Sequence, residues 1–154
     1  ELMAGVALRG FERFEAELAR AWNEGRPEPI GAFENLGKAY LAFARNEPAF
    51  YAAMFESGIS LDVDPALRRA SDGAFAILRE ASEVICATLP KEKRPPSLMM
   101  ALHIWAMSHG IASLFSRGDG ARRKLPMSPE DLLEAGLLLY LHGLGIGTEN
   151  SPRS

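Results

Sequence analysis

The side chains of this sequence that could do chemistry are few and widely spaced. None of the three histidines, His103, His109 and His142, has a glutamate three or four residues before it, and no HExxH or CxxC pattern suggests a metal. His103 and His109 are six residues apart, which points them to different faces of one helix. The single cysteine, Cys86, follows Ile85 on a helix and is interpreted as an inert buried thiol.

Patterns typical of enzymes are also missing. The sequence has no GxSxG nucleophile elbow, no glycine-rich phosphate loop and no pair of inward carboxylates. Asp62 and Asp64 precede a helix and could bind a cation, but capping of the helix N-terminus is favoured. We therefore expect a protein that is not an enzyme and that holds neither a metal nor a cofactor.

Aromatic and methionine side chains offer a different kind of chemistry. Nine aromatic residues come from five of the expected helices: Phe11, Phe14, Tyr40, Phe43, Phe50, Tyr51, Phe55, Phe75 and Trp105. Met54, Met99, Met100 and Met107 add soft, adaptable surface. A cavity lined by such residues with a few polar groups would hold an apolar ligand. The pattern alone favours a filled core over a cavity, because aromatic stripes usually serve packing.

Two polar aromatic groups share one helix face within this set. Trp105 and His109 are four positions apart in the sequence, and both ring N–H groups need partners when they are buried. The partners are either groups on neighbouring helices or a ligand.

Helices must position these side chains, because composition disfavours strands. The chain has 154 residues, of which 47% are hydrophobic, with 23 Ala and 20 Leu against 3 Val and 2 Thr. Alanine and leucine favour helices, whereas β-branched residues favour strands. The sequence predicts an all-α fold, a single domain of about six helices.

Proline, glycine and capping residues divide the chain into those helices. Asp64 and Ser128 each precede a proline and are expected to cap helices, and Ser97 is expected to cap a third. Residues 118–124 are expected to form a loop and residues 147–154 a disordered tail. The expected helices span residues 2–23, 30–45, 48–56, 65–89, 98–117 and 129–146.

The segment from Pro95 to Ser116 imitates a membrane span, since it contains no charged residue. It carries four serines and two histidines, and each polar group in lipid would need an internal partner. A buried helix of a soluble, cytoplasmic protein that does not enter a membrane is therefore favoured, and a reducing compartment fits the single cysteine.

The last two helices are apolar beyond the single stripe that a surface helix shows. One face of each is expected to pack on the core and another on a second copy, because a two-fold homodimer is a common way to bury such a surface. The alternative is that both helices are central in a monomer. The residues expected at the dimer interface are Ala112, Phe115, Leu132, Gly136, Leu139, Tyr140 and Gly143.

Three ordered blocks resemble a known family. Ala39-Tyr40-x-x-Phe43-Ala44, then Pro48-x-x-Tyr51-x-x-Met54-Phe55, then Trp105-x-x-x-His109-Gly110-x-x-x-Leu114 resemble the C-terminal regulatory domain of TetR-family transcriptional regulators, in its WHG type. The resemblance covers about residues 2–146 and agrees with a dimer through the last two helices, which would form a four-helix bundle with their copies. It also implies that residues 1–23 form the helix that joins a DNA-binding head, whose helix-turn-helix is absent from this sequence.

The resemblance implies a repressor-like sensor within residues 1–146. A small apolar effector would shift the connecting helix, so that two heads no longer fit half-sites roughly 34–36 Å apart and the operator is released. DNA would be contacted only through the missing head, in keeping with 17 basic against 20 acidic residues and a net charge of -3. The alternative is a headless helical homodimer that binds other proteins and no small ligand. The pocket candidates are Phe11, Phe14, Tyr40, Phe43, Tyr51, Met54, Phe55, Phe75, Leu78, Met100, Ile104, Trp105, Met107, Ser108 and His109.

Overall fold

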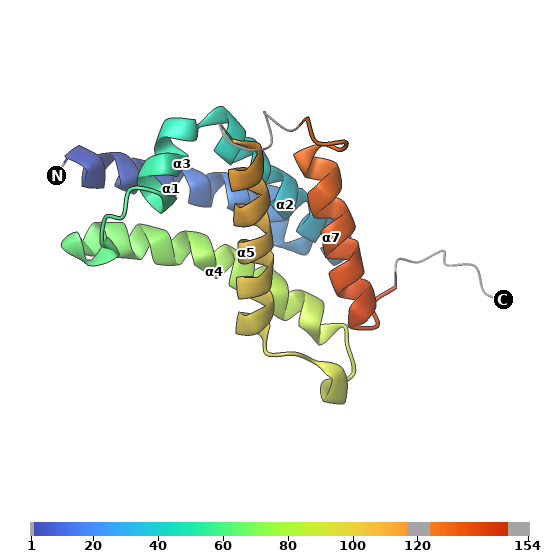
Figure 1. Ribbon diagram of the computed structural model, residues 1–154. Helices are drawn as coiled ribbons and strands as arrows, with labels where there is room; N and C mark the ends of the chain where they lie inside the picture. The colour runs from blue at the N-terminus through green and yellow to red at the C-terminus, as the bar shows by residue number, and fades with distance from the viewer. Residues whose placement is uncertain (1, 117–123, 148–154) are drawn as a thin grey trace.

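The computed structural model describes residues 2–116 and 124–147, and the regular structure in that part of the chain is entirely helical. The all-α prediction is therefore confirmed, and each predicted helix matches an observed one to within three residues at its ends. Parts of the expected loop (118–123) and tail (148–154) lie outside the described residues. The α-helices are α1 (Leu2–Trp22), α2 (Pro29–Asn46), α3 (Pro48–Phe55), α4 (Pro65–Ala87), α5 (Ser97–Phe115) and α7 (Pro129–Gly143), with 3-10 turns η1 (Asn23–Gly25), η2 (Leu61–Val63) and η3 (Lys91–Lys93) (Figure 1).

Local capping chemistry explains where several helices begin. Asp64 accepts a hydrogen bond from the Ala66 backbone N–H at 2.9 Å, and Ser128 accepts one from the Asp131 N–H at 3.0 Å. Both bonds satisfy helix N–H groups that have no partner within the helix. The two predicted caps are confirmed.

Two helix starts differ from the expectation. The predicted cap at Ser97 is wrong: Ser97 is already the first helical residue, Pro96 stands before it in an extended conformation, and no side-chain cap bond forms. The two consecutive prolines hold the backbone extended until the helix starts directly after them. At α2 the cap is Glu28, whose carboxylate accepts from the N–H groups of Ile30 and Gly31.

The helices pack in crossing layers around one core. Helix α1 runs along α4, and α5 crosses in front of α4 with α7 beside it (Figure 1). Helix α2 contacts α1, α4, α5 and α7, so it lies at the centre of the arrangement. The inward stripe of α1 recurs every three or four residues, as an amphipathic helix requires: Ala7, Phe11, Phe14, Leu18 and Trp22 are all buried.

A glycine lets α1 approach α3 closely. A Cβ atom at Gly10 would lie 2.7 Å from Met54 Sδ and 3.2 Å from the Phe50 Cβ. Any larger residue would have to move α1 or displace the methionine. The position of α1 is therefore coupled directly to α3.

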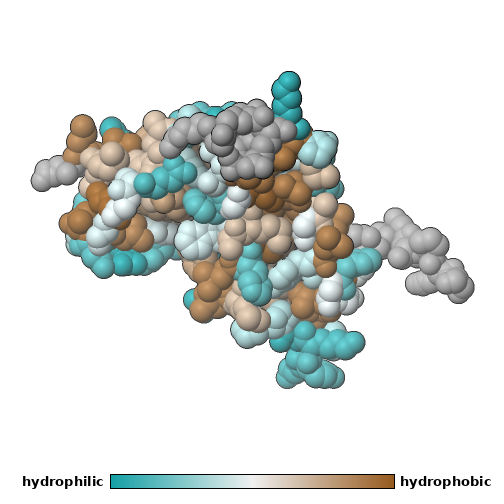
Figure 2. Space-filling view, viewed as in Figure 1, coloured by the Kyte–Doolittle hydropathy of each residue, from teal (hydrophilic) through white to brown (hydrophobic). Residues whose placement is uncertain are grey.

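Helix α5 is, among the described helices, the one long and apolar enough to cross a membrane by length and composition. A core helix of a soluble protein passes the same test. In the fold α5 packs against α4, α2 and α7, and this packing buries 33% of its apolar stretch. Figure 2 shows that hydrophobic surface nevertheless remains over α5 and α7, where Leu98, Met99, Leu102 and Leu139 are exposed.

Candidate functional site

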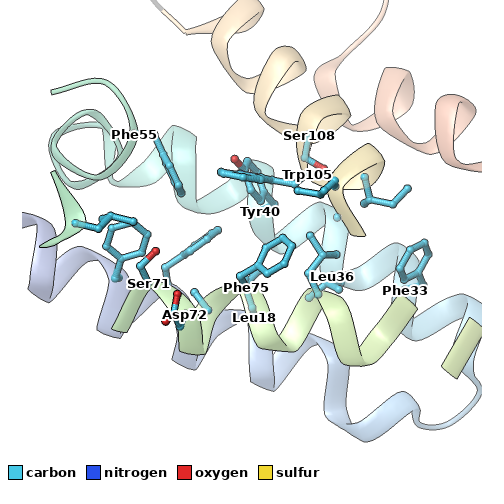
Figure 3. A pocket seen from close by; sticks show the side chains of 18 residues that line it. Leu18, Phe33, Leu36, Tyr40, Phe55, Ser71, Asp72, Phe75, Trp105 and Ser108 are labelled. Carbon is cyan, nitrogen blue, oxygen red and sulfur yellow. The ribbon is translucent and has the colours of Figure 1, made fainter. Parts of the chain in front are cut away.

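A cavity of about 260 Å³ lies between α1, α2, α4 and α5. Phe55 of α3 and Leu61 of η2 complete its wall. Its volume is close to the lower end of the roughly 300–1,000 Å³ that ligand pockets usually have. Figure 3 shows side chains from all of these helices converging on one space, with Trp105 and Ser108 reaching into it from α5.

Nine of the fifteen pocket candidates from the sequence line this cavity. They are Phe11, Phe14, Tyr40, Phe55, Phe75, Leu78, Ile104, Trp105 and Ser108. The fold thus collects aromatic side chains from α1, α2, α3, α4 and α5 around one space.

Edge-to-face contacts hold the aromatic walls in place. Phe11 meets Phe55 with ring centroids 5.4 Å apart, and Phe75 meets Trp105 at 5.9 Å, both in T-shaped geometry. Pairs of this kind contribute about 0.5–1.5 kcal/mol each beyond the area that they bury. The walls are therefore preformed.

A chain of polar groups runs behind one wall. The Tyr40 and Tyr51 hydroxyls lie 2.9 Å apart, and the Tyr51 hydroxyl is also hydrogen-bonded to His109 Nδ1. Burial raises the pKa of both tyrosines, so their phenols remain neutral. Of the two polar rings on α5 that were expected to need a hydrogen-bond partner, His109 thus has one within the protein, on α3. His103 instead bonds the Tyr140 hydroxyl on α7, so the two histidines face different neighbours as predicted.

Six pocket candidates lie outside the cavity lining: Phe43, Tyr51, Met54, Met100, Met107 and His109. Phe43 packs on Phe14 at a centroid distance of 4.9 Å, and Met54 fills the space beside Gly10. Met100 is fully buried beside the Cys86 sulfur, and Met107 lies against Gly136. These residues support the walls from behind.

The sequence prediction missed nine lining residues. Some stand on inward helical stripes, where periodicity marks them as buried but does not separate a core from a cavity. Ser71 and Asp72 belong to the polar side of α4, and no local pattern distinguishes them from a solvated face. The missed residues are Leu18, Phe33, Leu36, Gly37, Leu61, Ser71, Asp72, Ala74 and Leu102.

Polar groups stand at opposite sides of the cavity. Ser71 and Asp72 lie together on α4, whereas Ser108 hangs from α5 on the other side, with aromatic rings between them (Figure 3). Within the described part of the chain, neither serine hydroxyl forms a hydrogen bond and Asp72 forms no ion pair. A ligand in the cavity would find these groups available.

The expected interface residues on α5 and α7 face in several directions. Leu139 is 74% exposed and Gly143 is open to solvent, while Ala112 is buried and a Cβ at Gly136 would lie 2.7 Å from Met107 Sδ of the same chain. Phe115, Leu132 and Tyr140 are partly buried. The outer surface of α7 available to a second copy therefore centres on Leu139.

The remaining reactive groups have structural surroundings. Cys86 is buried, and burial raises the pKa of its thiol. Asp62 pairs with Arg68. No cluster of three or more potential metal ligands occurs among residues 2–116 and 124–147.

Comparison with known proteins finds a matching family model and a similar solved structure. A family model described as "Tetracyclin repressor-like, C-terminal domain" matches residues 33–140. A solved structure titled "Structure of a protein with unknown function from Rhodococcus sp. RHA1" is similar with a TM-score of 0.76 and 23% identity. That similarity covers 92% of this chain and 72% of the other. No curated protein sequence matches the chain.

Proposed function

Because this chain belongs to the family of tetracyclin repressor-like C-terminal domains, we propose that it is the effector-binding and dimerisation domain of a cytoplasmic transcriptional regulator. Its effector is a small, mainly apolar molecule bound in the cavity between α1, α2, α4 and α5. DNA contact belongs to an N-terminal helix-turn-helix outside these 154 residues. The domain binds and assembles, and it has no catalytic role.

The observation that carries this proposal is the share of α1 in the cavity wall. Phe11, Phe14 and Leu18 all come from α1 and all line the cavity. A ligand there contacts the helix that would lead to the DNA-binding head. Occupancy can therefore change the position of α1 against α4 and α3.

The free energy that moves α1 comes from ligand binding. A ligand moves an equilibrium only by the difference between its affinities for the two positions of α1. The close packing of Gly10 on Met54 makes those positions distinct, because α1 cannot slide without disturbing α3. Release of the operator follows when the two heads of a dimer change their spacing.

The dimer in this proposal forms through the outer faces of α5 and α7. Leu139 is 74% exposed, which makes it the most exposed large hydrophobic side chain of α5 and α7. Isologous pairing of two copies would bury it. Leu139→Glu is expected to convert a dimer to a monomer in sedimentation velocity, while Val63→Glu, at another exposed apolar site, leaves the dimer intact. A wild-type monomer at high protein concentration would contradict the dimer.

Ligand binding is tested with the fluorescence of Trp105. In a Trp22→Phe variant the remaining indole lines the cavity, so phenylbutanol should change its emission and give a saturable calorimetric signal. The rival function, a headless dimer that only binds proteins, predicts neither signal. Absence of both signals across a set of apolar probes would refute effector binding.

A further inference from the structure

The cavity has an uneven distribution of charge. Its eighteen lining residues include one charged side chain, Asp72, and no lysine, arginine or histidine. A carboxylate ligand would meet no cation there, and its own charge would face that of Asp72. The lining therefore selects against anions.

Asp72 is free to bind a cation. Two basic residues lie one helical turn before it, Arg68 and Arg69, and neither forms an ion pair with Asp72. Arg68 is hydrogen-bonded to Asp62 at 2.7 and 3.0 Å, and the charge of Asp72 adds to the rise in the pKa of this arginine. Asp72 itself forms no ion pair with any described residue. Its carboxylate oxygens therefore keep room for a ligand cation at the α4 side of the cavity, although Arg68 attracts the same charge from a distance.

Aromatic rings surround the space next to this carboxylate. Phe75 lies one turn further along α4, and Phe55 lies opposite (Figure 3). The faces of aromatic rings attract ammonium groups, and the attraction grows as water is excluded. Carboxylate and rings together favour a cation with an apolar body.

We propose that the effector is a small apolar amine that binds in its protonated form. Its ammonium group pairs with Asp72 and the Ser71 hydroxyl at the α4 wall, and its apolar body lies among the aromatic rings toward Trp105. The Ser108 hydroxyl, on the far side, receives any second polar group. This inference rests on the proposed function, since it names the chemical class of the same effector.

The test compares three probes with a common body: phenylbutylamine, phenylbutanol and phenylbutyrate. Calorimetry on the wild-type chain should show the tightest binding for the amine, weaker binding for the alcohol and the weakest for the carboxylate. Because Asp72 is exposed, we expect the amine to bind about fivefold more tightly than the alcohol, as a solvent-accessible ion pair allows. Added salt should weaken binding of the amine and leave the affinity for the alcohol unchanged.

Asp72→Asn should remove the advantage of the amine and leave alcohol binding unaltered. Glu83→Gln is the matched control, since it removes one negative charge from the exposed side of α4 outside the cavity lining. It should keep the full difference between amine and alcohol. Circular dichroism confirms that both variants are folded.

The outcomes separate this inference from the function on which it rests. If the alcohol binds as well as the amine, or if Asp72→Asn leaves the amine unaffected, the amine class is wrong while effector binding stands. If none of the three probes binds, both the amine class and the effector function fail.

Discussion

Filling the cavity from Ser108 should stabilise the protein and block its ligand. Ser108 is 2% exposed, lines the cavity and has no described hydrogen-bond partner. In Ser108→Leu, three added carbon atoms would occupy space that the structure leaves open. The matched variant Ser108→Ala removes the same hydroxyl and improves helix propensity, but leaves the cavity open.

The difference between these variants measures the cavity itself. Three buried carbons at about 0.8 kcal/mol each, less about 0.5–1 kcal/mol for the ordering of the leucine, give a gain of about 1.5 kcal/mol. For a chain of this size the gain raises the Tm by about 3–6 °C. Thermal unfolding followed by circular dichroism, at equal protein concentration for both variants, gives the value.

Ligand binding gives the second half of this test. Ser108→Leu should bind phenylbutanol at least tenfold more weakly than Ser108→Ala, because its side chain takes the place of the ligand. Overpacking of a filled core would instead destabilise Ser108→Leu by about 1–3 kcal/mol. That destabilisation, together with equal binding by both variants, would refute the existence of a usable cavity.

Three further perturbations test the supports of the site. Gly10→Ala should lower the free energy of unfolding by about 1–3 kcal/mol through its clash with the methionine of α3, while Gly5→Ala, with open space around it, should raise it by about 0.5–1 kcal/mol. Tyr51→Phe removes the central hydroxyl of the buried polar chain and should cost about 1–3 kcal/mol in urea unfolding, because its partners on α2 and α5 lose their hydrogen bonds. The hydrogen bond from Arg45, at the end of α2, lowers the pKa of Glu130. This carboxylate therefore stabilises the fold above its ordinary pKa of 4.5, and the contribution is lost as the pH falls. Glu130→Gln should flatten the decline of the unfolding free energy at acid pH.

Each of these predictions can fail clearly. Equal stability of the two glycine variants would mean that α1 and α3 are not in close contact. A Tyr51→Phe protein as stable as wild type would mean that the buried chain of hydrogen bonds does not stabilise the fold. An acid limb that is identical in Glu130→Gln and wild type would show that the arginine pair contributes nothing to folding.

Sequence reasoning located the helices well because their ends are local chemistry. Asp64 and Ser128 accept hydrogen bonds two or three residues ahead, which spacing alone reveals. Ser97 shows the limit of the same rule, since the preceding prolines decide the start of α5. Glu28 caps α2 although its residue type is not a favoured cap.

The site was predicted only in part because a buried stripe does not reveal what lies opposite it. Met54 and Met107 were expected in the cavity, but each fills the space that a glycine leaves on a neighbouring helix. That pairing depends on how the helices cross, which periodicity does not contain. Asp72 was missed because an acid on a helix surface is usually solvated, and only the fold brings it to the cavity edge.

The central claim is that a ligand in the cavity moves α1 within a dimer. Its most direct test is the distance between two spin labels, placed by Arg9→Cys in a Cys86→Ser background, so that each subunit carries one label on the exposed side of α1. Saturation with phenylbutylamine should shift this distance by about 1–2 Å or more, the scale of helix shifts in switching proteins. A distance that stays the same while calorimetry shows a filled cavity would contradict the claim.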